Sequence, residues 1–381
     1  MILGLAALAF AGPLATAGEG SSAKAGDLSF ETLDGWREHD PRPALAALRR
    51  QCDADGDRPG LAPWLPRLCA HLPADADAAA ARAFFERWFR PEPLRRDGTG
   101  FLTAYFEPEL AASPVPTDRF AVPLRAPPPG LERLDPAAYP PGLPPGLSHA
   151  RRRPDGRLVP LPDRAAIEAG ALDGAARPIA YLADPVDAFF VHVQGSARLA
   201  MPDGAVRRVG YAGKSGHPYT AIGRVLVEEG RLAAEAVTAD AIRAVLAADP
   251  EAARAVMDRN RSYVFFRDKP GGDPSLGPVA AGGVQLTPRA SVAVDRSHVA
   301  YGTPVYLWGD LPVADADVEA PFATLAIAQD TGSAIVGPAR ADLFLGSGEA
   351  AGRAAGRVKH RVGMVRLVFR DAADGAAAPG G

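Results

Sequence analysis

The stretch AQDTGSAIVGPARADLFLGSG, from Ala328 to Gly348, decides how the rest of the chain is read. It holds two aspartates twelve positions apart, Asp330 and Asp342, and an apolar run rich in strand formers, residues 323–328, leads into it. Acid side chains at the end of such a run, beside glycines that tolerate positive φ, predict carboxylates on tight turns at the mouth of a β structure. Catalytic residues are often found in such places. The glycines are Gly332, Gly337, Gly346, Gly348 and Gly352.

Size and composition indicate a soluble globular protein. The 381 residues suffice for two domains, and 47% are hydrophobic and 23% charged. The 40 glycines and 38 prolines favour short strands and many turns. The net charge is −3 and no basic run with interleaved aromatics appears, so we do not expect a nucleic-acid partner.

The first seventeen residues predict an export signal, because an apolar stretch is followed by Ala15-Thr16-Ala17, an A-x-A type cleavage site. A buried N-terminal helix is the alternative, and the usual basic n-region is missing. The mature protein is therefore expected in the periplasm, where association with the outer membrane or cell wall stays open. We expect no lipid anchor, since no cysteine lies near the cleavage point.

Cys52 and Cys69 are the only cysteines. In an oxidising compartment they can close one disulfide loop, and the alternative is two buried free thiols. The seven histidines are scattered without ligand spacing, so neither a metal nor another cofactor is expected.

Residues 28–95 read as helical and structural. After them, alternation through Leu102, Ala104 and Phe106 predicts a strand that ends at Pro108. Tyr105, Glu107 and Glu109 at its end form either a sugar-binding edge or a solvated strand end.

The middle of the chain mixes a proline-rich part with strands and helices. Residues 112–147 predict an extended arm or a linker, and residues 164–168 begin as a helix. Residues 189–193 read as a strand, followed by a hairpin turn at Asp203-Gly204 and a return strand over residues 206–211. Gln194 and Ser196, which interrupt the first strand, form either a sugar-binding subsite or a bulge.

A loop over residues 213–223 opens three short helices that end near Arg259. A strand over residues 260–267 and a boundary at Pro270-Gly271-Gly272 follow. Beyond it lies a series of short strands with the pattern of a barrel, and a disordered tail, residues 371–381. The predicted barrel strands cover residues 292–294, 304–307, 322–327, 343–345 and 362–369.

Several motifs carry a resemblance to a known family. ASVAVDRS with Asp295, IAQDTGSAIVGP with Asp330 and ARADLFLGSG with Asp342 resemble the three-aspartate domain of membrane-bound lytic murein transglycosylases of the A type (MltA). Upstream, FLTAYFEP, FFVHVQGSARL, GYAGKSGHPYTAIG and NRSYVFFR resemble the rest of that family, in the same order along the chain.

The resemblance implies a mainly β fold. A catalytic domain of N-terminal helices and a double-psi β-barrel is expected over residues 28–107 and 271–370. A second β-rich, glycan-binding domain is expected as an insertion over residues 108–270, with a groove between the two for a peptidoglycan strand. A monomer is expected.

The resemblance also implies roles for individual residues. Asp342 corresponds to the catalytic acid and Asp330 to a supporting aspartate, while Asp295, like Cys52 and Cys69, is assigned a structural role. Substrate contacts are expected from Tyr105, Glu107, Gln194, Ser196, Tyr211, Lys214 and Tyr219. Two positions depart from the family pattern: Phe106 replaces a tyrosine and Ser215 an asparagine.

Such an enzyme cleaves the β-1,4 bond between N-acetylmuramic acid and N-acetylglucosamine. One carboxyl first protonates the leaving oxygen and then, as a base, takes the proton of the sugar's own C6 hydroxyl, which gives a 1,6-anhydromuramic end. The acid must be protonated when substrate arrives, although aspartate has a pKa of about 3.9 in water. Burial, or the charge of Asp330, is expected to raise the pKa of Asp342.

Other functions fit parts of the sequence. Asp330-Thr331-Gly332 matches the motif of an aspartic protease, which needs two such aspartates, and the chain has no second Asp-Thr-Gly or Asp-Ser-Gly. A non-catalytic peptidoglycan-binding protein would hold glycan without cutting it. A true hydrolase would use Glu107 or Glu109 as partner to Asp342 and would release reducing ends.

Overall fold

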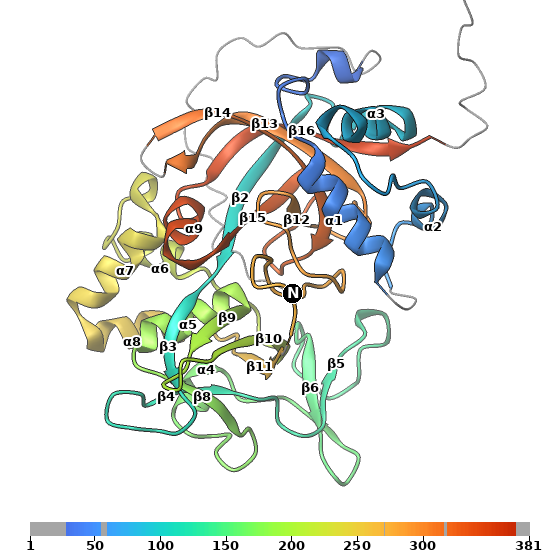
Figure 1. Ribbon diagram of the computed structural model, residues 1–381. Coiled ribbons are helices and arrows are strands. Elements are labelled where there is room, and N and C mark those ends of the chain that lie inside the picture. Colours follow the sequence, from blue (N-terminus) through green and yellow to red (C-terminus); the bar gives the residue numbers. More distant parts are fainter. Residues whose placement is uncertain (1–27, 55–58, 270, 316–317, 371–381) are drawn as a thin grey trace, which may run out of the picture. The chain divides into compact units, whose positions relative to one another are not determined.

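The computed structural model describes residues 28–54, 59–269, 271–315 and 318–370, which form two compact units (Figure 1). One unit, here called the barrel unit, comprises the described residues within 28–105, 272–346 and 357–370. The other, here called the insert unit, comprises Phe106–Gly271 and Ser347–Gly356. The predicted export signal and C-terminal tail lie outside the described residues.

Six strands close the barrel. Their order is β16-β13-β14-β12-β15-β2, and β2 pairs back onto β16. Only the β12–β14 pair is parallel among the barrel pairs whose register is described. A seventh strand, β1 (Phe89–Pro93), adds to β16 outside the ring. The six strands are β2 (Thr99–Glu107), β12 (Ser291–Val294), β13 (Pro304–Asp315), β14 (Val318–Asp330), β15 (Arg340–Ser347) and β16 (Lys359–Phe369).

Helices pack against the barrel with their apolar faces. The short helix η1 (Phe30–Thr32) precedes α1 (Arg42–Asp53), α2 (Leu65–Cys69) and α3 (Ala78–Trp88), whose buried side chains join those of β13, β14 and β16 in one core. Cys52 at the end of α1 and Cys69 at the end of α2 form a disulfide with 5.6 Å between their Cα atoms. The sequence left open whether these cysteines form a disulfide or remain free thiols, and the structure has the disulfide.

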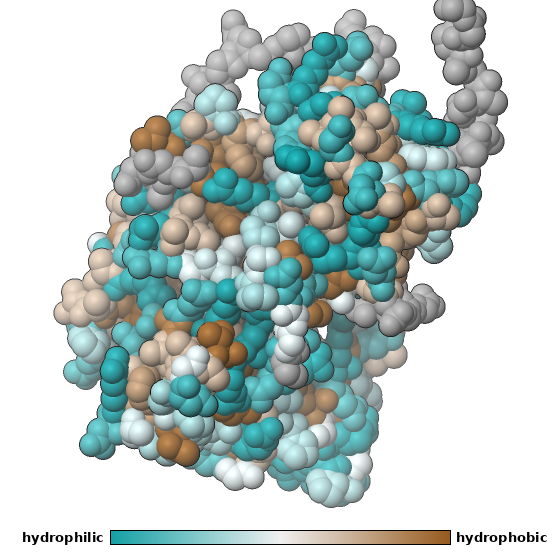
Figure 2. Space-filling model, in the orientation of Figure 1, coloured by the Kyte–Doolittle hydropathy of each residue, from teal (hydrophilic) through white to brown (hydrophobic). Residues whose placement is uncertain are grey.

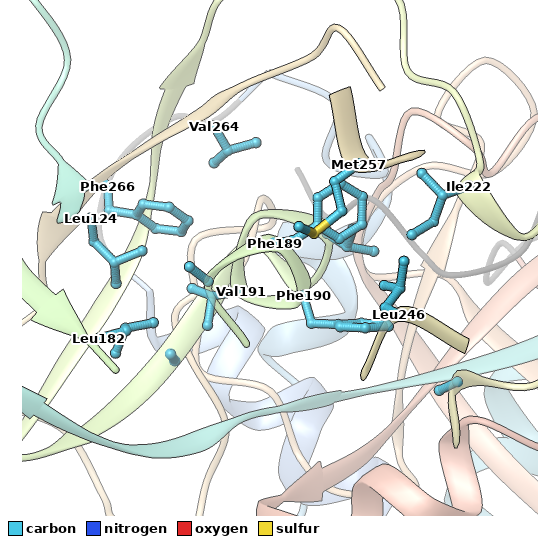
Figure 3. Close-up of a cluster of buried hydrophobic side chains, with 14 of the residues drawn as sticks. Leu124, Leu182, Phe189, Phe190, Val191, Ile222, Leu246, Met257, Val264 and Phe266 are labelled. Carbon is cyan, nitrogen blue, oxygen red and sulfur yellow. The ribbon is translucent and has the colours of Figure 1, made fainter. Parts of the chain in front are cut away.

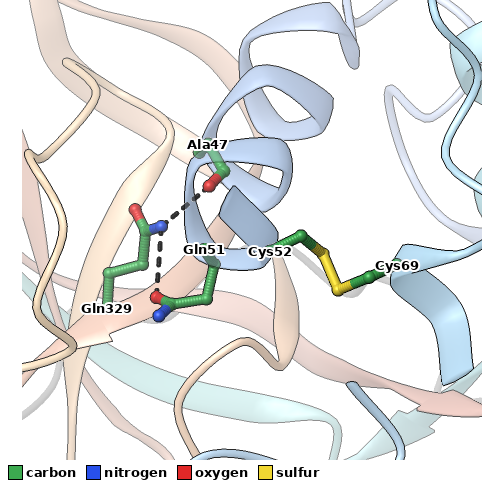
Figure 4. Close-up of a disulfide and its surroundings, with 5 residues drawn as sticks. All are labelled: Ala47, Gln51, Cys52, Cys69 and Gln329. Carbon is green, nitrogen blue, oxygen red and sulfur yellow. Dashed lines mark hydrogen bonds between the residues drawn. A yellow bond between two sulfur atoms is a disulfide. The ribbon is translucent and has the colours of Figure 1, made fainter. Parts of the chain in front are cut away.

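Helix α1 also fixes the end of β14 (Figure 4). The fully buried Gln329 donates from Nε2 to the carbonyl of Ala47 at 2.9 Å and lies 3.5 Å from Oε1 of Gln51. Its Oε1 accepts a hydrogen bond of 2.6 Å from Ser291 on β12. Since a buried amide is costly to leave unsatisfied, these bonds hold the position next to Asp330.

The insert unit contains a six-stranded sheet in the order β11-β10-β9-β3-β8-β4 and a three-stranded sheet in the order β5-β6-β7. The predicted hairpin around Asp203-Gly204 is confirmed, with β9 and β10 antiparallel and Gly204 at φ 82°. The strands are β3 (Glu109–Ser113), β4 (Val122–Arg125), β5 (Leu131–Arg133), β6 (His149–Arg152), β7 (Leu158–Val159), β8 (Pro178–Leu182), β9 (Ser196–Ala200), β10 (Val206–Lys214) and β11 (Val264–Asp268).

One large apolar core holds this unit together (Figure 3). Phe189, Phe190 and Val191 lie at its centre, between strand residues such as Phe266 and helix residues such as Met257. The helices of the unit are η2 (Pro136–Ala138), α4 (Arg164–Glu168), α5 (Pro185–Gln194), α6 (Ile222–Glu228), η3 (Ala234–Ala236), α7 (Ala239–Ala248), α8 (Pro250–Asp258) and α9 (Gly348–Ala355).

The prediction of a strand over residues 189–193 is wrong, because this run forms most of α5. Asp184 caps the helix by accepting from the backbone N–H groups of Val186 and Asp187, Pro185 occupies the first turn, and Gly195 ends it at φ 79°. The helix is buried on every side over its last seven residues, so its sequence is a continuous apolar run without helical periodicity. Such a run cannot be distinguished from a buried strand by pattern alone.

Two further predictions change in detail. Residues 112–147, expected to be an arm or linker, contribute β4, β5 and part of β3 to the two sheets. The strand expected from residue 260 begins at Val264, because Asn260 and Ser262 lie in a loop where Asn260 Oδ1 accepts from the N–H of Ser262.

The surface is mixed in character. Hydrophilic and hydrophobic residues are interspersed over the face shown in Figure 2. Within the described ranges, none of the helices is both long enough and apolar enough to cross a bilayer.

Candidate active site

Two buried aspartates flank one residue of the barrel. Ala293 on β12 pairs with Asp330 at the end of β14 on one side and with Asp342 in β15 on the other. Residues opposite each other on neighbouring strands project to the same face, so the two carboxyl groups share one side of the sheet. Strand spacing places their Cα atoms on the order of 10 Å apart. Both side chains are fully buried.

Asp330 is held by three hydrogen bonds. Its Oδ1 accepts from the backbone N–H groups of Thr331 at 2.9 Å and Ala281 at 3.2 Å. Its Oδ2 accepts from the hydroxyl of Tyr105 at 3.0 Å. Donors directed at both oxygens favour the charged form of a carboxyl group.

Asp342 has a different environment. Its Oδ1 accepts a short hydrogen bond, 2.5 Å, from the hydroxyl of Thr103 on β2. Its Oδ2 is buried and has no hydrogen-bond partner among the described residues. A buried carboxylate oxygen without a partner is costly, whereas a protonated one avoids most of that cost. The geometry therefore favours a neutral Asp342 with its proton on Oδ2.

The pKa values follow from these surroundings. Burial raises the pKa of Asp342 to about 6, with a further increase from the charge of Asp330, while Arg340 and the Thr103 hydrogen bond act in the opposite direction. Burial also raises the pKa of Asp330, and its hydrogen bonds from Thr331, Ala281 and Tyr105 oppose that shift. Asp330, with three donors against one, is the acid that ionises first.

Tyr105 joins the two acids from β2. Burial, and then the charges of Asp330 and Asp342, raise the pKa of its hydroxyl well above the usual value, so it acts as a donor. Its ring packs against Phe344 of β15 with 5.3 Å between centroids. Of the expected substrate contacts, Tyr105 is the one that the structure brings to the aspartates.

The structure adds residues that sequence reasoning missed. Thr103 lies two positions before Tyr105, and Arg340 two positions before Asp342, so each shares a strand face with an expected site residue. That alternation is present in the sequence, but in this strand the more obvious pattern is the apolar series at Leu102, Ala104 and Phe106. The N–H of Ala281 comes from a loop, and no sequence pattern indicated it.

Asp295 stabilises a turn after β12. Its Oδ1 accepts from the N–H and hydroxyl of Ser297, and its Oδ2 accepts from the N–H of Gly337 at 2.8 Å. Although burial acts to raise it, these bonds keep the pKa of Asp295 below its ordinary value. The arrangement is that of a structural carboxylate tying two loops together.

The remaining expected contacts lie in the insert unit, where Glu107 is the centre of a buried ion-pair network. Its carboxylate lies 3.0 Å from Nε of Arg198 and 3.0 Å from Nε of Arg208, and it accepts from the hydroxyl of Ser347. Burial raises the pKa of Glu107 and the two arginines oppose this. The side chain of Glu107 is fully buried, whereas Glu109, which also pairs with Arg198, is half exposed.

Gln194, Ser196 and Lys214 are also buried. Gln194 accepts from the N–H of Phe106 at 3.4 Å, and Ser196 sits in the β9–β10 ladder opposite Gly210. Burial, aided by Arg133, lowers the pKa of Lys214 to about 8.

Tyr211 and Tyr219 are partly buried against the apolar core, and burial raises the pKa of both hydroxyls, that of Tyr219 to about 12. The hydroxyl of Ser215, a departure from the family pattern, accepts from the N–H of Tyr263 and so closes a backbone contact. Across the described ranges, no group of three or more histidine, cysteine, aspartate or glutamate side chains could hold a metal ion.

Residues 290–368, which include both buried aspartates and Asp295, match the family model described as "3D domain", so the chain contains a three-aspartate domain. Residues 101–267 match a second model, described as "MltA specific insert domain". The chain belongs to the MltA family of membrane-bound lytic murein transglycosylases. The expected mainly β fold with a barrel is confirmed.

Several known proteins resemble the chain. The crystal structure of a membrane-bound lytic murein transglycosylase from Agrobacterium tumefaciens is 38% identical, with 90% of this chain and 96% of that chain covered and a TM-score of 0.78. The structure of MltA from Escherichia coli with bound chitohexaose is 27% identical, with 87% of this chain and 90% of that chain covered and a TM-score of 0.63.

Membrane-bound lytic murein transglycosylase A of Vibrio cholerae is 38% identical over 205 residues, which is 52% of this chain and 54% of that protein. The match thus spans about half the length of the curated relatives.

Proposed function

We propose that the chain is a peptidoglycan lytic transglycosylase. It cleaves the β-1,4 bond between N-acetylmuramic acid and N-acetylglucosamine and leaves a 1,6-anhydromuramic end. Membership of the MltA family supports the reaction class, and the chitohexaose bound to the Escherichia coli relative supports a glycan as substrate. Family membership also removes the main support for an aspartic protease, because Asp330-Thr331-Gly332 is part of the matched barrel domain.

One observation carries the mechanism: Oδ2 of Asp342 is buried and unpartnered among the described residues, in a carboxyl group whose pKa is raised by burial to about 6. A general acid works best when its pKa lies near the working pH. In this proposal Asp342 carries its proton on Oδ2, the oxygen to which none of the described residues makes a hydrogen bond.

The proposed reaction does not use water as a reactant. Asp342 donates the Oδ2 proton to the bridging oxygen as the bond between that oxygen and C1 of the muramic acid breaks, and the bond's electron pair stays with the leaving oxygen. Positive charge develops at C1. The C6 hydroxyl of the same sugar then forms a bond to C1 and gives its proton to the Asp342 carboxylate, which restores the starting acid.

Asp330 supports this cycle through its charge. With three donors it remains a carboxylate while Asp342 is still protonated, and like charges disfavour a second ionisation nearby. It also adds negative potential while positive charge grows on the sugar.

The place of action that we propose is the cell envelope, on its periplasmic side, where the substrate is found. The Cys52–Cys69 disulfide supports an oxidising compartment of this kind. The relatives carry "membrane-bound" in their names, and no such attachment is assigned to this chain.

The test is release of soluble muropeptides from purified sacculi. Asp342→Asn keeps the size and the Thr103 hydrogen bond but has no transferable proton, so its turnover is expected to fall by at least about 100-fold. Asp310→Asn, an exposed aspartate on β13 of the same barrel, is the matched control and should retain full activity. A folded Asp342→Asn variant with wild-type turnover would overturn the assignment.

A further inference from the structure

Three side chains of the barrel unit, those of Arg340, Thr103 and Asp342, form one hydrogen-bonded chain. Arg340 on β15 donates from Nη2 to the hydroxyl of Thr103 on β2 at 2.7 Å, and that hydroxyl lies 2.5 Å from Oδ1 of Asp342. Thr103 and Asp342 are both buried. Two of the six barrel strands, β2 and β15, which are neighbours in the sheet, supply all three residues.

The chemistry of these groups fixes the direction of the hydrogen bonds. A guanidinium group only donates, so the Thr103 hydroxyl must accept from Arg340 and cannot give it a proton. The single hydroxyl proton is then directed to Oδ1 of Asp342, which must act as the acceptor. An oxygen that accepts this bond is a poor site for the proton of the neutral carboxyl group.

Arg340 is itself held in place. Its guanidinium lies 5.2 Å from the centroid of the Phe101 ring and also donates to the backbone carbonyls of Phe101 and Ala341. The backbone N–H of Phe101 donates to the carbonyl of Ala339, the residue that precedes Arg340. The donor that orients Thr103 is thus anchored from several directions.

We propose that Thr103 and Arg340 are positioning residues that confine the transferable proton of Asp342 to Oδ2. Arg340 occupies a lone pair of the Thr103 hydroxyl, the hydroxyl proton occupies Oδ1, and the carboxyl proton is left with the one oxygen that has no partner among the described residues. This inference rests on the proposed function and deepens it, because the same oxygen then gives the proton to the leaving group and receives it back from the C6 hydroxyl.

The effect on titration has a definite sign. The groups facing Asp342 are Arg340 on β15, Asp330 at the end of β14, and Thr103 and Tyr105 on β2. The Thr103 hydrogen bond and Arg340 stabilise the carboxylate and lower its pKa, against the upward effects of burial and Asp330. Removing the Thr103 hydroxyl should therefore raise the pKa of Asp342 and move the alkaline limb of the pH–rate profile to higher pH.

The test compares Thr103→Val, which keeps the shape but loses the hydroxyl, with Thr103→Ser, which restores it. Thr103→Val should lower kcat roughly 10- to 100-fold with KM unchanged, because the variant loses the hydrogen bond that stabilises the Asp342 carboxylate as the Oδ2 proton leaves. Thr103→Ser should return kcat and the pH profile toward those of the wild type. Thr324→Val is the control, because the Thr324 hydroxyl on β14 donates to the carbonyl of Arg289 at 2.8 Å, away from the acids.

A second readout does not depend on turnover. Carboxyl carbon NMR of the full chain, labelled at aspartate, follows the titration of Asp342 directly, with Asp342→Asn used for assignment. Thr103→Val and Arg340→Met, which perturb the chain of bonds at two different points, should both raise the pKa measured for Asp342. Unchanged titration in both folded variants, or a Thr103→Ser variant as impaired as Thr103→Val, would overturn the proposal. If the wild type released no anhydro products, the proposed function would fail while the titration would still decide the role of Thr103.

Discussion

The carboxyl group of Asp342 is placed where it is costly for folding. A pKa of about 6 in the folded protein, against about 3.9 in an unfolded chain, means that the folded state binds more protons between these values. Stability should therefore be highest below about pH 4 for this group and should decrease as the pH rises through about 6. The proposed mechanism needs the same group in its protonated form, so the stability lost at Asp342 would be the cost of a usable proton.

Asp342→Asn is accordingly expected to be more stable than the wild type at pH 7, by roughly 1–3 kcal/mol. Asparagine stays neutral and still accepts from Thr103, so the variant escapes the cost of ionising a buried group. Melting temperatures at pH 4.5 and pH 7.5 provide the measurement, with a gain expected only at the higher pH. An equal difference at both pH values would show that Asp342 does not titrate in this range.

A second test concerns Glu107, which either stabilises the fold through its buried ion pairs or contacts the substrate. Glu107→Gln removes a fully buried charge that pairs with two arginines and should reduce stability by about 3–5 kcal/mol, as for other broken buried ion pairs. Glu109→Gln, on the same strand end but half exposed, should cost less than about 1 kcal/mol.

Thermal unfolding of both variants, together with glycan affinity, decides between the two roles. A Glu107→Gln variant that melts like the wild type but binds glycan weakly would support the substrate contact expected from the family resemblance.

The residues that sequence reasoning could find are those with a local signal. Asp330 follows an apolar run and has a glycine nearby, so its place at the end of β14 was predictable. Asp342 was expected on a turn as well, but it lies inside β15, where its apolar neighbours follow it in the sequence. For Thr103 and Arg340 the sequence offered only a two-residue spacing from Tyr105 and Asp342, and the contacts that make them important span 239 and 237 positions of the chain. Only the closed barrel brings them together.

Among the elements, the Cys52–Cys69 disulfide joins α1 to α2, and both helices pack against the barrel core, so we expect the disulfide to stabilise that packing. The disulfide joins residues 17 positions apart, and closing a loop of this size contributes about 3 kcal/mol. Since α1 also holds Gln329 beside Asp330, its attachment matters to the site as well as to the core.

We expect the double variant Cys52→Ala/Cys69→Ala to unfold at a clearly lower temperature than the wild type, by an amount that corresponds to about 3 kcal/mol. Calorimetry with and without a reducing agent supplies the check. Reduction should bring the wild type down to the double variant and leave the double variant unchanged. A wild type that is insensitive to reductant would contradict this account.

Helix α5 was predicted as a strand because a local sequence pattern does not show on how many sides a segment is buried. Phe189, Phe190 and Val191 have strand-like side chains, and the core that surrounds them on every side removes the helical periodicity. The cap at Asp184 with Pro185 was the better signal, since both residues favour a helix start. By contrast, α4 was predicted correctly from the same kind of start, with Asp163 accepting from the N–H of Ala166.

In the molecule as a whole, each of the two units is built from segments that are far apart in the sequence. The division between the two units falls inside β2, between Tyr105 and Phe106, and inside β15, between Gly346 and Ser347. No local pattern marks these positions, because a strand continues through each. The mainly β character and the barrel could be predicted from turn signals and family motifs, whereas the return of residues 347–356 to the insert unit could not.

In the proposed mechanism Asp342 acts first as the general acid and then as the general base, and water takes no part. The most direct measurement is digestion of purified sacculi in water enriched in oxygen-18, with mass spectrometry of the released muropeptides. We predict fragments that end in 1,6-anhydromuramic acid and contain no heavy oxygen. Fragments with a reducing end that carries one heavy oxygen would mean that water attacks C1, and the assignment of Asp342 as acid and then base to the sugar's own hydroxyl would be wrong.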